Sequence, residues 1–78
     1  MNVLAFGIAK EIIGNSTARI EWGNVITAGD LKGLIEKEYP AFKKLGSYMI
    51  AVNNEYATDE TIINKGDDVA IIPPVSGG

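Results

Sequence analysis

One long amphipathic helix is predicted between Thr27 and Pro40, and it limits the folds that are open to this chain. Thr27 is a favourable N-cap residue, Asp30 three residues later completes a variant of the capping box, and Pro40 ends the helix. Its apolar positions recur at helical spacing: Leu31, Leu34, Ile35 and Tyr39. Gly33 weakens the helix by about 1 kcal/mol relative to Ala, and we expect it to allow close packing on a sheet. A single helix covers only one face of a sheet.

Five strands are predicted around this helix, at residues 2–7, 17–22, 48–52, 55–57 and 69–72. The first and last strands are continuously apolar, which is typical of central strands, and the long connection between them allows a parallel pairing. The predicted fold is therefore α+β of the β-grasp (ubiquitin-like) type, a mixed five-strand sheet with one long helix on one face and an extended C-terminal tail. Residues 1–74 form the domain, and residues 75–78 form a flexible diglycine tail.

The connections are short and rich in turn-forming residues. Residues 8–13 are expected to form one or two helical turns that end at Gly14, so that the first two strands form a widened antiparallel hairpin. Residues 58–65 are expected to form a polar loop from which both Ile62 and Ile63 enter the core.

The sheet face away from the helix is predicted to be apolar as well. Because side chains alternate between the faces of a strand, Leu4 and Phe6 point opposite to their neighbours in the first strand, and Ala70 and Ile72 do so in the last. Tyr56 extends the same surface. Two interpretations stay open: loops fold over this face, or a partner protein covers it.

Composition excludes most routes to independent catalysis. The 78 residues contain no cysteine and no histidine, which excludes disulfides, zinc–thiolate and iron–sulfur sites, thiol nucleophiles and Ser-His-Asp triads. A chain of this length has little room for a substrate cavity. We therefore expect no catalysis by the chain alone, no bound cofactor and no metal site.

Charge and hydropathy restrict the partners further. The formal net charge of −3 argues against nucleic acid as a partner. We find no apolar stretch long enough to span a membrane and no signal-peptide pattern. A cytoplasmic location is the expectation.

The chain ends in a segment suited to projecting a carboxylate. Pro73 and Pro74 have no amide hydrogen and cannot continue a sheet ladder. Gly77 and Gly78 have no Cβ, so they can pass through a channel that is too narrow for other residues. The alternative is a frayed terminus without function. Activation of the Gly78 carboxylate as an acyl-adenylate requires ATP and an enzyme partner, because the chain has no phosphate-binding motif.

The sequence resembles the MoaD-type sulfur carriers, the small subunits of molybdopterin synthase. Residues 3–7 and 10–14 resemble the first strand and short helix of that family, and residues 52–53 and 66–70 resemble its later hairpin and last strand. The most specific match is the closing Pro-Pro-Val-Ser-Gly-Gly of residues 73–78.

The resemblance implies a mechanism centred on Gly78. A ubiquitin-activating-like adenylyltransferase uses ATP to adenylate the Gly78 carboxylate, and a persulfide donor protein then supplies sulfur to form a C-terminal thiocarboxylate. The tail inserts into the large synthase subunit, within a heterotetramer. The sulfur passes to cyclic pyranopterin monophosphate in molybdenum cofactor biosynthesis.

The resemblance also implies site residues. Gly77 and Gly78 form the functional tail, and the implied partner contacts are Phe6, Lys10, Tyr56, Ile72, Pro73, Pro74, Val75 and Ser76. Family members often have aromatic residues in the last strand, where this chain has isoleucines, and Tyr56 stands where an aliphatic residue is common.

Three other functions are compatible with the sequence. The first is a ubiquitin-like protein modifier, or a sulfur carrier for tRNA thiolation or thiamine, because these share the same adenylate chemistry. The second is an interaction domain with an inert tail. The third is a small hydrolase using Asp67 and Asp68, although adjacent carboxylates after a glycine are typical turn residues.

Overall fold

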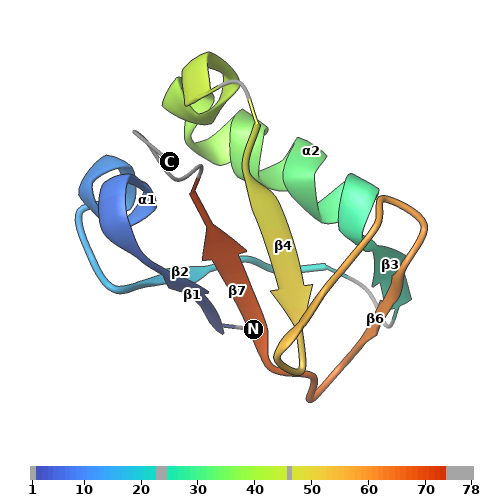
Figure 1. The fold of residues 1–78 in the computed structure, drawn as a ribbon. Helices are drawn as coiled ribbons and strands as arrows, with labels where there is room; N and C mark the ends of the chain where they lie inside the picture. The colour runs from blue at the N-terminus through green and yellow to red at the C-terminus, as the bar shows by residue number, and fades with distance from the viewer. Residues whose placement is uncertain (1, 23–24, 46, 74–78) are drawn as a thin grey trace.

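The computed structural model describes residues 2–22, 25–45 and 47–73. Its main sheet has five strands, and Figure 1 shows how β1, β2, β4 and β7 lie in it. The strand order is β2-β1-β7-β4-β5, and β1 and β7 are parallel while the other neighbours are antiparallel. The strands are β1 (Asn2–Ala5), β2 (Thr17–Arg19), β4 (Met49–Val52), β5 (Glu55–Tyr56) and β7 (Val69–Ile72). The predicted mixed sheet, with the first and last strands in neighbouring central positions, is confirmed.

One long helix covers one face of this sheet. This helix, α2 (Ala28–Glu38), starts at the predicted N-cap Thr27, whose Oγ1 accepts a hydrogen bond of 3.1 Å from the Asp30 amide. The Asp30 carboxylate accepts a hydrogen bond from the Thr27 amide in return, which completes the capping box. A shorter helix, α1 (Gly7–Ile13), connects β1 to β2 and ends at Gly14, as predicted.

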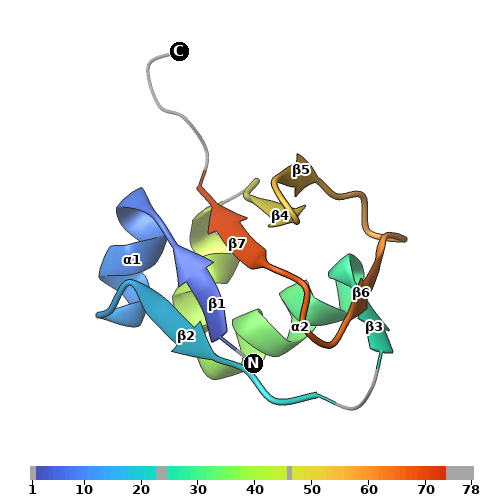
Figure 2. The ribbon, with the colours of Figure 1, turned by 90° about the horizontal axis from the view of Figure 1, so that it is seen from below.

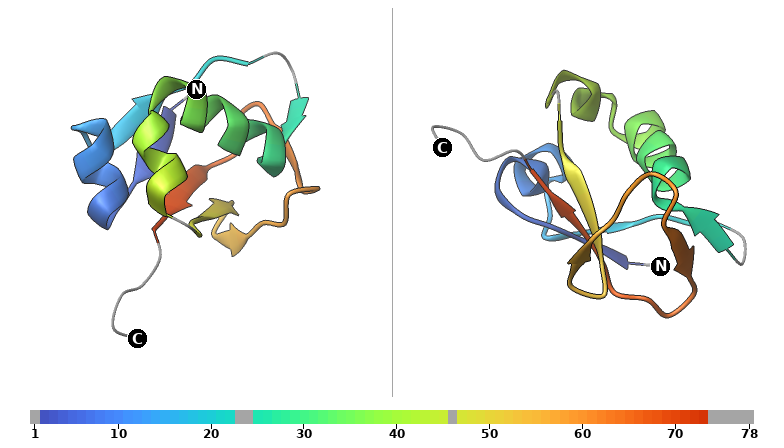
Figure 3. Two further views of the ribbon diagram at one scale, coloured as in Figure 1. Left: turned by 90° about the horizontal axis from the view of Figure 1, so that it is seen from above. Right: turned by 45° about the vertical axis from the view of Figure 1, so that its right-hand side comes forward.

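A 3₁₀ helix, η1 (Pro40–Leu45), follows α2 and was not predicted. Pro40 ends α2, but its fixed φ also suits the first turn of a new helix. η1 lies on the same side of the sheet as α2 (Figure 3). It buries Phe42 completely, and the Phe42 ring packs 5.4 Å from the Tyr48 ring. η1 thus extends the core beyond the end of α2.

The core lies between the sheet and the helical layer. Alternate residues of the two central strands face this layer, and burial follows this alternation: β1 and β7 each bury every second side chain. The fully buried large side chains are Phe42, Leu31, Ile35, Ile50, Ile63, Ile71, Val3 and Val69. The described ranges contain no helix that has both the length and the apolar character needed to cross a membrane.

The structure corrects the expected loop at residues 58–65. It contains a strand, β6 (Ile62–Asn64), which pairs with β3 (Val25–Thr27) to form a small second sheet beside the start of α2 (Figure 2). Ile63 is buried as expected, but Ile62 is 58% exposed. The expectation for Ile62 was wrong because neighbouring residues of a strand point to opposite faces.

Gly33 does not allow close packing on the sheet, contrary to expectation. It lies on the exposed side of α2, and nothing lies within 4 Å of the position that a Cβ would occupy. The close approach is at Gly29, where a Cβ would lie 3.1 Å from the Asp59 carbonyl oxygen. The Gly29 amide donates a hydrogen bond of 2.9 Å to that oxygen.

These two glycines give a matched pair of stability predictions. Gly33→Ala is expected to stabilise the protein by about 1 kcal/mol, because it improves helix propensity without new contacts. Gly29→Ala is expected to destabilise it, because the added methyl group meets the Asp59 backbone. Urea unfolding of the two variants measures both effects. Equal shifts of the urea unfolding midpoints of the two variants would contradict the conclusion that the close approach is at Gly29 and not at Gly33.

Candidate functional site

A row of side chains crosses the sheet face that α2 leaves open. The strand registers place Leu4 opposite Ala70, Ala70 opposite Ala51, and Ala51 opposite Tyr56. Residues directly opposite one another share a face of the sheet, so this row spans β1, β7, β4 and β5. Leu4 is 45% exposed and Tyr56 is 68% exposed. The predicted apolar character of this face is confirmed.

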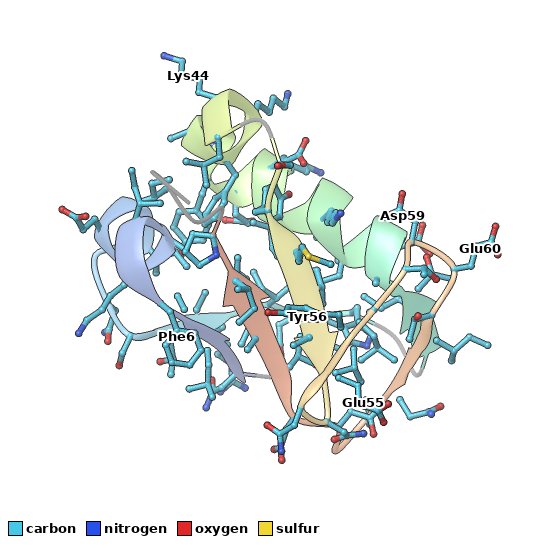
Figure 4. All side chains as sticks on the ribbon, in the orientation of Figure 1. Phe6, Lys44, Glu55, Tyr56, Asp59 and Glu60 are labelled. Carbon is cyan, nitrogen blue, oxygen red and sulfur yellow. The ribbon has the colours of Figure 1, made fainter. Side chains whose placement is uncertain are left out.

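A groove of about 360 Å³ runs along this row. We call it the open-face groove, and its lining residues are Leu4, Phe6, Ala51, Asn54, Tyr56, Ala70 and Ile72. Phe6 and Tyr56 lie on either side of β7 (Figure 4), and Phe6 is 50% exposed. All lining residues except Asn54 have apolar or aromatic side chains, so the groove is suited to apolar contact with another surface. Leu4, Phe6 and Tyr56 are exposed, so among the described residues no loop folds over this face. The interpretation that a partner protein covers it stays a prediction.

The predicted site residues divide into three groups. Phe6, Tyr56 and Ile72 come together in the open-face groove. Lys10 is exposed on α1 and is not among the lining residues. Pro73 follows the end of β7 and is half-buried. The remaining predicted residues, Pro74, Val75, Ser76, Gly77 and Gly78, lie outside the described residues, as does the expected boundary between domain and tail.

Four lining residues were not among the predicted site residues. Leu4 and Ala70 had been placed on the apolar face from the sequence, whereas Ala51 and Asn54 had not. Ala51 lies on the open face because β4 alternates, with Ile50 and Val52 buried on the other side. The alternation of the predicted strand 48–52 was sufficient to place Ala51 there. Asn54 lines the groove only because the turn between β4 and β5 brings it there, and no sequence pattern indicated this.

The edge of the groove is held in place by a hydrogen-bonded turn. Asn53 and Asn54 both have positive φ, as a tight hairpin requires. The Asn53 side-chain oxygen accepts a hydrogen bond of 2.9 Å from the Asp68 amide, and its Nδ2 donates to Asp67 Oδ1. Asp67 Oδ2 accepts a second bond from the Asn64 amide. Both oxygens of the Asp67 carboxylate therefore hold turns, and Asp68 contributes its backbone amide. The engagement of Asp67 argues against the hydrolase interpretation.

A buried phenol with a raised pKa, that of Tyr48, lies away from the groove. The Tyr48 hydroxyl donates a hydrogen bond of 2.6 Å to Glu36 Oε2. Burial, followed by this bond and the Glu36 charge, raises the pKa of the Tyr48 phenol above its ordinary value. Lys32 lies over the Tyr48 ring and pairs with Asp59 at 3.4 Å. These contacts join α2 to the residue before β4 and to the loop before β6.

Within the described part of the chain, no group of three His, Cys, Asp or Glu side chains could hold a metal ion. A second hollow, of about 490 Å³, is lined by Asn2, Arg19, Glu21, Trp22, Lys65, Gly66 and Asp67. It mixes both signs of charge and contains none of the predicted site residues. The open-face groove is therefore the candidate functional surface.

The model of the ThiS family matches residues 3–78 of this sequence. The chain belongs to the ThiS family. A relative from Caenorhabditis briggsae, named molybdopterin synthase sulfur carrier subunit, is 33% identical over 81 residues, covering all of this chain and 96% of the relative. This membership confirms the resemblance found in the sequence.

Solved structures similar to this ThiS-family chain share its fold. SAMP1 from Haloferax volcanii is 26% identical, with a TM-score of 0.82 over all of this chain and 98% of the other. A putative molybdopterin converting factor subunit 1 from Pyrococcus furiosus has the same identity and TM-score, over 95% of each chain. The predicted β-grasp fold is thereby confirmed.

Proposed function

We propose that this ThiS-family chain is the sulfur-carrier small subunit of a molybdopterin synthase, with Gly78 as the residue that carries sulfur. The proposal rests chiefly on the full-length similarity to proteins named molybdopterin synthase sulfur carrier subunit. That similarity supports a sulfur-carrier role in molybdenum cofactor biosynthesis. The closing Pro-Pro-Val-Ser-Gly-Gly, residues 73–78, supports Gly78 as the site.

The proposed reaction requires partners for every chemical step. An activating enzyme transfers AMP from ATP to the Gly78 carboxylate and releases pyrophosphate. A persulfide donor protein then displaces AMP, and a thiol reductant cleaves the resulting acyl disulfide to leave the thiocarboxylate. Transfer of that sulfur to cyclic pyranopterin monophosphate, with water entering in its place, restores the carboxylate. This chain contributes the acyl group and the surfaces that present it.

The open-face groove is the proposed docking surface for these partners. Ile72 is the last residue of β7 and lines the groove, and Pro73 follows it directly. A partner that covers the groove therefore also contacts the start of the segment that leads to Gly78. The large synthase subunit and the adenylyltransferase are the two proposed occupants.

Sulfur transfer to the pterin precursor tests this function. Thiocarboxylated protein, mixed with a cognate large subunit and cyclic pyranopterin monophosphate, is expected to form the dithiolene product in proportion to the carrier supplied. The same mixture with unmodified carboxylate protein is the control. Absence of product, with the large subunit active on a known carrier, would contradict the proposed acceptor.

A protein modifier is the second candidate, favoured by the structural similarity to SAMP1, a small archaeal modifier protein. A modifier forms isopeptide bonds between Gly78 and lysines of target proteins after the same adenylation. Gel analysis of cells that express a tagged chain distinguishes the two functions. Conjugates of higher mass that disappear without Gly78 would establish modification.

A further inference from the structure

Gly7 forms the corner between β1 and α1. Phe6 is extended, with φ −128° and ψ 156°, whereas Gly7 has a φ of +55°. This left-handed conformation favours glycine, because a Cβ is strained there. The corner is followed at once by helical hydrogen bonding, since the Ala9 amide donates a bond of 3.0 Å to the Phe6 carbonyl.

Pro73 lies directly against this corner. In the parallel β1–β7 pairing Ala5 is opposite Ile71, so Gly7 and Pro73, each two residues further along, are level with one another. Pro73 Cγ is 3.2 Å from the position that a Cβ on residue 7 would occupy. This is closer than ordinary van der Waals contact between carbon atoms. The absence of a side chain at Gly7 therefore makes room for the proline ring.

Both sides of this contact are held rigidly. On one side, α1 is fixed to the core by the fully buried Ala9 and by Ile12 and Ile13, which pack against the core cluster. On the other side, the pyrrolidine ring locks the φ of Pro73. The placement of Pro73, the first residue after β7, is thus defined by its ring packed against Gly7.

We propose that Gly7 is a positioning residue: through its contact with the Pro73 ring it sets the direction in which the chain leaves β7 toward Gly78. The inference rests on the sulfur-carrier function proposed above. Gly7 itself touches no reacting group. Its effect is to present the C-terminal carboxylate to a partner that already holds the open-face groove.

Gly7→Ala tests this inference, with Gly14→Ala as the matched control. Gly14 lies at the other end of α1 with a φ of +82°, so alanine there meets comparable backbone strain, but nothing lies within 4 Å of its Cβ position. A difference between the two variants therefore reports the contact with Pro73 rather than backbone strain. Pro73→Ala, alone and combined with Gly7→Ala, completes a double-mutant cycle.

The kinetic readout is ATP-dependent pyrophosphate release by a cognate activating enzyme. Gly7→Ala is expected to lower kcat about tenfold through misplacement of the carboxylate, with KM little changed because the groove is intact. Gly14→Ala is expected to leave both constants near wild type. In a chain that already carries Pro73→Ala, Gly7→Ala is expected to lower kcat less than about twofold. Two results would overturn the inference. One is an equal loss of kcat from Gly7→Ala in the wild-type chain and in the Pro73→Ala chain. The other is an equal loss of kcat in Gly7→Ala and Gly14→Ala.

A second readout is independent of activity. The amide chemical shifts of Val75 and Ser76 are expected to change in Gly7→Ala and to stay unchanged in Gly14→Ala, with both proteins folded by circular dichroism. If wild-type protein supports no pyrophosphate release with an enzyme active on a known carrier, the proposed function fails, and these shifts alone decide the role of Gly7. Unchanged amide chemical shifts of Val75 and Ser76 in both variants would overturn the proposed role of Gly7.

Discussion

Deletion of Gly78 is expected to abolish thiocarboxylate formation while the fold stays intact. The deletion shortens the chain by one residue, about 3.5 Å, and moves the carboxylate away from the point of attack. Misplacement by even 1 Å can cost about 100-fold in rate, so we expect a loss of at least that size. Mass spectrometry of the intact chain after incubation with ATP, activating enzyme and sulfur donor measures it.

Thermal unfolding is the control for this deletion. Within residues 2–22, 25–45 and 47–73, the last member of the core cluster is Ile71, so we expect the midpoint of unfolding not to move. Gly78→Ala is a milder companion variant, because it keeps the length and adds only a Cβ. A deletion variant that still acquires sulfur at a wild-type rate would contradict the requirement for Gly78 as the residue that carries sulfur. One that no longer folds would contradict the prediction that the tail is separate from the domain.

Phe6→Asp is expected to weaken binding to the large synthase subunit by at least about 30-fold. An aspartate at this position places a charge in the apolar groove, where its desolvation on binding is costly, and truncation of a central aromatic contact alone commonly costs about 2 kcal/mol. Ile72→Asp should act in the same direction. Isothermal titration calorimetry with the large subunit measures both.

Ile62→Asp is the matched control for the groove. Ile62 is as exposed as Phe6, at 58% against 50%, but it lies on β6 of the small second sheet and does not line the groove. Its substitution should leave the affinity unchanged. Equal loss in the Phe6 and Ile62 variants, or no loss in the Phe6 and Ile72 variants, would remove the groove as the docking surface.

The main features of the fold could be predicted because each had a local cause in the sequence. The capping pair Thr27 and Asp30 and the stop at Pro40 placed α2 within one residue of its observed ends. The continuous apolar character of the first and last strands placed them together in the centre of the sheet. The open face followed from the same two strands, because alternation in a strand is fixed by geometry.

The missed elements depend on contacts between distant segments. β6 has only three residues, and among the described residues its ladder partner is β3, which lies before α2 in the chain. Neither segment shows enough alternation to indicate a strand alone. Asn54 enters the groove through the β4–β5 turn, and the contact between Gly7 and Pro73 depends on the β1–β7 register. These placements could not be predicted from the sequence because they depend on the strand register and turns of the folded sheet.

The intact mass of the full-length chain tests the central claim most directly. The chain is incubated with ATP, a cognate activating enzyme and a persulfide sulfur donor, and its C-terminal peptide is then isolated. The sulfur-carrier proposal predicts a mass increase that corresponds to replacement of one oxygen by sulfur, confined to the peptide ending at Gly78. An unchanged mass, with the same enzyme shown to act on a known carrier, would contradict it.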